Sequence, residues 1–316
     1  MQIGYHLSSE EHPPGALVRH AVAAEAAGFE HMSISDHFHP WGEDQGHSPS
    51  VWVVLGALLN ATERASFTTT VTCPILRMHP ALVAHAAATV AQLGPGRFEL
   101  GVGTGERLNE HVLGQHWPPA SIRQEMLAEA IEVIRDLWRG VLTSHDGTHF
   151  RVENAQIYDA PEQPPPIHVA ASGADAAELA GTHGDGLVAL APDADMVARF
   201  RERAGADAPV IGMTHVCWAD HADEALAVVR RWWTTAGLPG SLNAELPLPR
   251  FFDDASAAVS DDARRGAMVM GNDTGAYAEM IAAYRDAGFD RLHLHQVGPD
   301  QQGFLDAWRH ELRDAA

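Results

Sequence analysis

The sequence contains no lysine, so its 21 fixed cations are all arginines, and they are outnumbered by 42 aspartates and glutamates. The formal net charge is −21 at pH 7. A nucleic-acid-binding surface needs clustered positive charge to neutralise phosphates, and this sequence has no basic run. We therefore expect no nucleic-acid partner.

Cysteines and long apolar runs are also scarce. The two cysteines, Cys73 and Cys217, lie far apart and lack metal-ligand spacing, which indicates a reducing compartment rather than a disulfide scaffold. The first residues lead straight into a strand-like segment, without a basic region or a long apolar run. This pattern predicts neither a signal peptide nor a membrane span, and hence a cytoplasmic protein without a membrane partner.

Hydrophobic residues make up 46% of the chain, which is enough for a sizeable core. Short apolar runs alternate with amphipathic helical patterns, as is typical of a parallel α/β fold. The expected strands are residues 2–6, 31–35, 67–72, 98–103, 167–171, 186–190, 210–216 and 291–296. The expected helices are residues 15–27, 51–62, 81–93, 122–138, 174–183, 194–204, 221–236, 274–287 and 302–312.

Eight strands with helices between them predict a (β/α)₈ TIM barrel, a fold of typically about 250 residues. The surplus residues fall into two insertions. Residues 141–158 contain the hairpin turn signal Asp146-Gly147, and residues 237–265 are rich in Pro, Ala and Asp and predict a loop with a helix. A doubly wound open sheet is the competing fold, but the even spacing to the end of the chain favours one barrel domain over residues 1–316.

In a barrel the active site lies at the carboxyl ends of the strands. The apolar alternation around Ile34 ends in Asp36 and His37, and Pro40 cannot continue a strand ladder. Acids, histidines and glycines follow the other expected strands in the same way. The residues collected at this edge are Tyr5, His6, Glu10, Asp36, His37, Trp41, Thr70, Val71, Thr72, Cys73, Pro74, Gly101, Val102, Gly103, Thr104, Gly105, Glu106, Asn109, Glu110, Ala171, Ser172, Gly173, His293, Leu294, His295 and Gln296, and Ala174 starts the helix after the fifth strand.

Two of these segments suggest ligand binding. Ser172-Gly173, before a helix that starts at Ala174, would leave free N–H groups for an anion, although an ordinary N-cap is the alternative. The alternate glycines of residues 101–105 lack the G-x-G-x-x-G spacing of a dinucleotide site, and they suit close backbone approach to a flat ligand.

Two H-x-H pairs, His37/His39 and His293/His295, raise the alternative of a metal-dependent hydrolase. Residues two apart on a strand share a face, so the geometry is possible. Amidohydrolase-type barrels carry the pair on the first strand together with further ligands, and this sequence departs from that arrangement. We expect no metal.

The motif set of Ser35–Trp41, Gly101–Glu106 with Leu108-Asn109-Glu110, and Trp138-Arg139-Gly140 resembles the luciferase-like flavin/deazaflavin superfamily. Within it, the sequence is most similar to the coenzyme F420-dependent glucose-6-phosphate dehydrogenase group, with a weaker match over residues 187–265. The resemblance implies a (β/α)₈ barrel, a homodimer and F420 at the barrel mouth as a hydride carrier. An FMN-dependent monooxygenase of the same superfamily is an alternative, and a non-enzymatic cofactor carrier a remote one.

The resemblance also implies roles. The family's catalytic histidine falls on His37, with Asp36 beside it orienting it and lining the cofactor ring, and its tryptophan falls on Trp41. The glutamate that donates a proton or stabilises ring charge falls on Glu106, and a second acid falls on Glu10. A non-prolyl cis peptide is implied at Thr70–Val71. The ring would also be lined by Cys73, Thr104, Gly105 and Asn109, and the phosphate held by Ser172, Gly173 and Ala174.

Histidine suits the base in hydroxyl oxidation because its ordinary pKa is near neutrality. The sequence departs from the sugar-phosphate enzymes, whose phosphate-binding lysine and arginine align with about Asp193 and Ala267. An acid would repel a phosphate, and Arg250, Arg264 or Arg265 would have to substitute. We therefore expect an uncharged alcohol, ketone or activated alkene as substrate, with sugar phosphate as the alternative. The expected apolar lining is Leu190, Leu246, Phe251, Phe252 and Met268.

Overall fold

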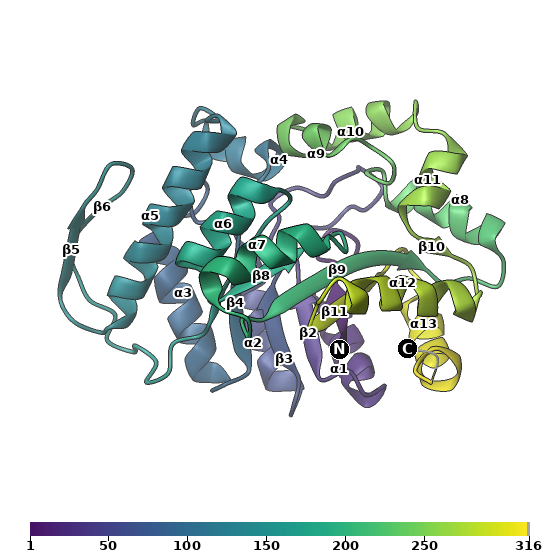
Figure 1. The fold of residues 1–316 in the computed structure, drawn as a ribbon, viewed down its shortest axis with the longest axis horizontal. Coiled ribbons are helices and arrows are strands. Elements are labelled where there is room, and N and C mark those ends of the chain that lie inside the picture. The colour runs from purple at the N-terminus through teal and green to yellow at the C-terminus, as the bar shows by residue number, and fades with distance from the viewer. Residues whose placement is uncertain (315–316) are drawn as a thin grey trace.

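The computed structural model describes residues 1–314 and shows one closed parallel barrel surrounded by helices (Figure 1). The strands run in the order β1-β2-β3-β4-β7-β8-β9-β11, and β11 pairs with β1 to complete the ring. This confirms the predicted (β/α)₈ fold over the open sheet. The barrel strands are β1 (Gln2–Leu7), β2 (His31–Ile34), β3 (Ser66–Thr69), β4 (Phe98–Val102), β7 (Ile167–Ala170), β8 (Gly186–Ala189), β9 (Val210–Cys217) and β11 (Arg291–Gln296).

The predicted strands agree with the observed ones to within a few residues. The largest difference is at β3, which ends at Thr69 instead of residue 72. Beyond that end, the Thr70–Val71 peptide is cis, as the resemblance implied, and Thr72 forms an isolated bridge to Val102 of β4.

The outer layer consists of helices that pack on the barrel and on one another. The helices that follow the barrel strands are α1 (Pro14–Ala26), α2 (Val51–Ala61), α3 (Pro80–Leu93), α5 (Ala120–Trp138), α6 (Ala174–His183), α7 (Ala194–Ala204), α8 (Ala222–Trp232), α12 (Thr274–Asp286) and α13 (Gln301–Ala307). A π-helical turn, Trp308–Leu312, continues α13. Within residues 1–314, no helix has both the length and the apolar character to cross a bilayer.

Both predicted insertions are present. The first forms the antiparallel hairpin β5 (Thr143–Asp146) and β6 (Arg151–Ala155), which projects beside α5 in Figure 1. The second is more helical than predicted, and it contributes α9 (Gly240–Glu245), α10 (Pro249–Ser256) and α11 (Asp261–Ala267). A short strand, β10 (Val269–Met270), then pairs with β9. A short helix, α4 (Arg107–Glu110), and the 3-10 turn His111–Leu113 follow β4.

The barrel interior is unusually polar, because the alternation of side chains along the strands places histidines on the inner face. Leu292 and Leu294 of β11 lie in the core shared with the helices, so their neighbours His293 and His295 face the barrel axis. On β1, a Cβ atom at Gly4 would come within 2.1 Å of the His293 ring. Branched aliphatic side chains usually fill such an interior. Here histidines and glycines occupy positions where those side chains would normally lie.

Candidate active site

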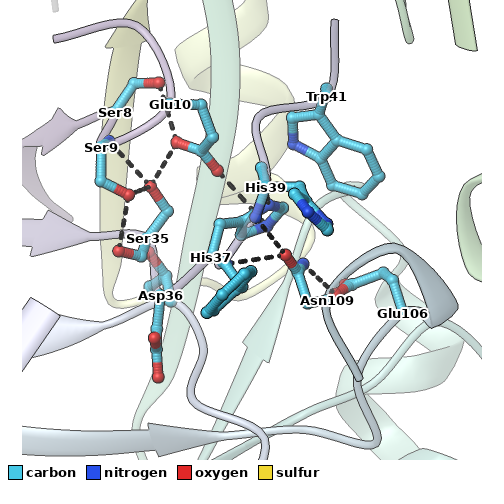
Figure 2. Close-up of polar contacts among 12 residues, drawn as sticks. Ser8, Ser9, Glu10, Ser35, Asp36, His37, His39, Trp41, Glu106 and Asn109 are labelled. Atoms are coloured by element: carbon cyan, nitrogen blue, oxygen red, sulfur yellow. Dashed lines mark hydrogen bonds and ion pairs between the residues drawn. The ribbon is translucent and has the colours of Figure 1, made fainter. Parts of the chain in front are cut away.

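His37 lies in the loop after β2, and both of its ring nitrogens are near oxygen atoms (Figure 2). Nδ1 lies 3.1 Å from the carbonyl oxygen of His39, which can only accept, so Nδ1 carries a proton. Nε2 lies 3.3 Å from Oε1 of Glu10. Because Nδ1 is bonded to the His39 carbonyl, Nε2 is the nitrogen that can exchange a proton with a ligand beside Glu10. The side chain of His37 is 9% exposed.

Glu10 is held in an ionised, well-bonded state in the loop after β1. Its Oε2 accepts hydrogen bonds from Ser8 at 3.0 Å and from Ser35 at 2.5 Å. Burial by itself would raise the pKa of this carboxyl, but the neighbouring His37 and the Ser35 hydrogen bond together hold the pKa below its ordinary value. A carboxylate is therefore fixed at the edge of His37 that carries Nε2, as Figure 2 shows.

Asn109 fixes the backbone of the loop that carries His37. Its Oδ1 accepts from the N–H groups of Phe38 at 2.9 Å and of His39 at 3.1 Å, and its Nδ2 donates to Glu106 at 3.4 Å. The side chain is 2% exposed. The predicted contact of Asn109 with a cofactor stays a prediction, but the structure gives the residue a role that the sequence did not reveal, which is to hold this loop.

The structure does not support the expected role of Asp36 in orienting His37. Its carboxylate accepts from Thr72 and from Arg77, at 2.9 Å each, and it points away from the imidazole in Figure 2. Arg77 also pairs with the buried Glu110, whose Oε2 accepts from the Arg77 backbone N–H. Burial, followed by the charge of Glu106, raises the pKa of Glu110 even though Arg77 opposes the shift.

These contacts tie together the loops after β2, β3 and β4. The sequence analysis named Glu110 only as part of the motif after the fourth strand, and it missed Arg77. The connection between these residues depends on the spatial closeness of the three loops. The orientation of His37 comes instead from Glu10 and from the His39 carbonyl.

Trp41 closes one side of the site. Its ring lies 4.8 Å from the His37 ring and 5.3 Å from the ring of Phe252, which belongs to α10 of the second insertion. The contact with Trp41 places the predicted lining residue Phe252 next to the site, where its side chain is fully buried. Leu190, by contrast, is 59% exposed. The insertion therefore contributes an apolar wall beside the histidine.

The glycines after β4 allow the chain to pack tightly against the segment after β3. A Cβ atom at Gly103 would lie 2.7 Å from Val71, and one at Gly105 would lie 2.5 Å from the sulfur of Cys73. Cys73 is buried, and burial raises the pKa of its thiol well above the ordinary value. Thr70, Val71, Thr104, Gly105 and Glu106 remain half-buried, and are thus available to line a ligand at the mouth.

The start of α6 is open, as the sequence predicted. No side chain caps this end of the helix, and residues 172–174 are exposed. A Cβ atom at Gly173 would meet no atom within 4 Å. The free N–H groups of the first turn therefore face open space and could hold an anion.

The two H-x-H pairs occupy different surroundings. His37 and His39 lie in the loop at the mouth, whereas His293 and His295 face the barrel interior. In residues 1–314, no three His, Cys, Asp or Glu side chains are arranged to hold a metal ion.

The sequence matches the family model described as luciferase-like monooxygenase over residues 1–291. The chain belongs to the luciferase-like family.

Several luciferase-like relatives are F420-dependent enzymes. The F420-dependent glucose-6-phosphate dehydrogenase of Beutenbergia cavernae is 35% identical over 325 residues, covering 99% of this chain and 96% of that protein. The F420-dependent hydroxymycolic acid dehydrogenase of Mycobacterium tuberculosis is 39% identical over 306 residues, covering 94% of this chain and 84% of that protein. A solved F420-dependent secondary alcohol dehydrogenase, in complex with an F420-acetone adduct, superposes with a TM-score of 0.92 at 29% identity, covering 100% and 99% of the two chains. The resemblance inferred from the motifs is confirmed.

Arg250, Arg264 and Arg265 are the candidates to replace the phosphate-binding lysines of the sugar-phosphate enzymes, and each has another contact in the structure. Arg264 is buried and donates to the Ser256 carbonyl at 2.6 Å, and Arg265 pairs with Asp223 at 2.5 Å. The guanidinium of Arg250 lies over the ring of its own neighbour, Phe251. Asp193 caps α7 by accepting from the Met196 N–H. Two of the possible substitutes for the clamp, Arg264 and Arg265, are therefore engaged in structural contacts, and the aligned Asp193 is a helix cap.

Proposed function

We propose that this protein is an F420-dependent oxidoreductase that moves a hydride between the deazaflavin and an uncharged organic substrate, a secondary alcohol or the corresponding ketone. The observation that carries this proposal is the His37–Glu10 pair beside Trp41, in a chain whose relatives are F420-dependent dehydrogenases. The similarity at 29% identity to a secondary alcohol dehydrogenase supports the alcohol as the substrate class.

The residues present suit F420. The open start of α6 offers uncapped N–H groups and the space at Gly173 for a phosphate. The half-buried segments around Val71 and Thr104 offer a surface for a flat ring. When bound, the deazaflavin would supply the two-electron acceptor, and it would lie against Thr70, Val71, Cys73, Thr104, Gly105 and Asn109 with Glu106 at the rim.

The remaining chemistry belongs to the chain itself. Nε2 of His37 takes the proton of the substrate hydroxyl as the C–H bond gives up its hydride, and the reverse transfer protonates a ketone oxygen. The Glu10 carboxylate stabilises the imidazolium that results. The His39 carbonyl keeps the ring oriented, and Trp41 with Phe252 keeps water away from that side.

The uncharged substrate follows from the charges around the mouth. Glu10 and Glu106 present carboxylates, and Arg77 in the loop after β3 is already paired with Asp36 and Glu110. A phosphate or carboxylate on the substrate would meet repulsion there. Homodimeric assembly and a cytoplasmic location, implied by the resemblance and by cysteine usage, stay predictions.

The test is a turnover assay with purified protein, oxidised F420 and a panel of secondary alcohols and sugar phosphates. We expect at least one uncharged alcohol to bleach the visible absorption of F420, and glucose 6-phosphate to be a poor substrate. The same protein with reduced FMN should consume no oxygen above the rate of free flavin. Oxygen consumption with FMN and no F420 turnover would instead identify a monooxygenase.

A further inference from the structure

A second polar cluster lies inside the barrel, next to the site but outside the roles assigned above. His6 of β1, His215 of β9 and His295 of β11 come from three adjacent strands, and the rings of His6 and His215 each lie 5.1 Å from that of His295. On β9 the side of Gly212 faces Tyr284 and Phe289 of the outer layer, so His215, three residues along, faces the barrel axis.

Glu11, His295 and His215 form a hydrogen-bonded chain, the Glu11 relay. Oε2 of Glu11 lies 2.6 Å from Nε2 of His295, and Nδ1 of His295 lies 2.8 Å from Nδ1 of His215. Oε1 of Glu11 accepts from the Gly298 N–H at 2.8 Å. Glu11 and His295 are almost fully buried, at 0% and 1% side-chain exposure. A buried carboxylate with such partners fixes the orientation of the imidazole that it contacts.

The relay leaves one edge of His215 available. Its Nδ1 is hydrogen-bonded to His295, and the centroid of its ring lies 4.5 Å from that of the Trp233 ring, with the two rings tilted by 45°. Within the described residues, Nε2 of His215 has no hydrogen-bond partner, and the side chain is only half-buried. His215 lies near the carboxyl end of β9, which is the end of the strand at the barrel mouth.

The ring of His215 is linked to Trp41 through Trp233. Trp233 lies in a small apolar cluster against which Trp41 also packs, so the two tryptophans connect His215 to the His37 site. Burial, followed by the proximity of His295, holds the pKa of His215 well below its ordinary value. A neutral imidazole whose Nδ1 shares a proton with His295 can offer Nε2 either as donor or as acceptor. Hydroxyl and carbonyl oxygens are the groups that match both states.

Resting on the proposed function, the geometry points to His215 as a substrate-binding residue whose Nε2 holds a second, uncharged oxygen of the substrate. His295 and Glu11 are the positioning residues that aim it. The substrate class is therefore a secondary alcohol, or its ketone, that also carries another hydroxyl or carbonyl group. A carboxylate in that place would be repelled by the nearby Glu10 and Glu11.

The experiment compares 2-hexanol with 2,3-, 2,4- and 2,5-hexanediol as reductants of F420, in wild type and in His215→Leu. One neutral hydrogen bond contributes about a tenfold preference. We expect wild type to favour at least one diol over 2-hexanol by about tenfold in kcat/KM, mostly through KM, and His215→Leu to lose that preference. His215→Gln, which keeps a hydrogen-bonding end, should retain part of it. His85→Leu, on the exposed side of α3, is the matched control and should keep the full preference.

The outcomes separate the two proposals. Turnover of hexanol and diols by wild type at equal kcat/KM overturns the role of His215 and leaves the oxidoreductase in place. A preference for a diol that persists in His215→Leu also overturns the role of His215 and leaves the oxidoreductase in place. If none of the four alcohols reduces F420, the proposed function is overturned together with this inference. Should His215→Leu fail to fold, the wild-type ratios and His215→Gln still decide the question.

Discussion

Replacing His37 with alanine is expected to lower kcat by about 10²- to 10⁴-fold, the contribution typical of a positioned acid–base group. Nε2 faces Glu10 at 3.3 Å and is the site of proton exchange in the proposed reaction, so its loss removes proton transfer without removing the ring-binding surface. The affinity for F420, measured by fluorescence titration, should stay close to that of wild type.

The matched control is His85→Ala, because His85 is an exposed histidine on α3 that touches no residue of the site. It should keep both turnover and F420 affinity. A kcat of His37→Ala that equals wild type would mean that another group moves the proton. A collapse of F420 affinity in the same variant would mean that His37 mainly builds the binding site.

Replacing Arg77 with methionine is expected to destabilise the fold by about 3–5 kcal/mol, the cost of breaking a buried ion pair. Arg77 is 12% exposed, and its removal leaves two buried carboxylates, Asp36 and Glu110, without a cation. The free energy of unfolding from urea titration measures the effect. Because Asp36 and Glu110 join three loops at the mouth, F420 affinity should fall as well.

Arg64→Met is the control, since the Arg64–Glu63 contact is exposed and 3.9 Å long, and exposed pairs contribute at most about 1 kcal/mol. The triple variant Arg77→Met, Asp36→Asn, Glu110→Gln should recover part of the lost stability, because it removes the unpaired charges. Equal stability of Arg77→Met and Arg64→Met would contradict the account of this network.

The barrel fold could be predicted because the local sequence patterns for strands and for strand ends are consistent with one another. Alternation in residues 2–6 and 291–296 marks strands, and Pro40 marks where the second strand must have ended. The same alternation does not tell which face of a barrel strand lies inside, since both faces are buried. In β11 the leucines face the helices and the histidines face the axis, so the polar interior emerged only from the fold.

The sequence predicted the site residues that directly follow the end of one strand. It did not predict contacts that depend on the register between two paired strands. His37, Glu10 and Trp41 each follow a strand, and the structure brings them together. The contact between His215 and His295 joins residues 80 positions apart, and it exists because β9 and β11 pair in register at those two residues. The resemblance implied that Asp36 orients His37 and lines the ring, but in the structure its carboxylate accepts a hydrogen bond from Arg77.

At the end of α8, the apolar pattern of the sequence continues beyond the last helical residue. Residues 221–236 read as one amphipathic helix, yet α8 ends at Trp232. Trp233 and Ala236 are still buried, in the cluster beside Trp41, so their hydrophobicity reflects packing in a turn and not helical periodicity.

The central claim is that the barrel mouth holds a deazaflavin ring with His37 at its reacting edge. Equilibrium titration of the purified protein with oxidised F420 and, separately, with FMN tests it most directly. The account predicts saturable binding of F420 and at least tenfold weaker binding of FMN, a difference of about 1.4 kcal/mol. Tighter binding of FMN than of F420 would contradict it.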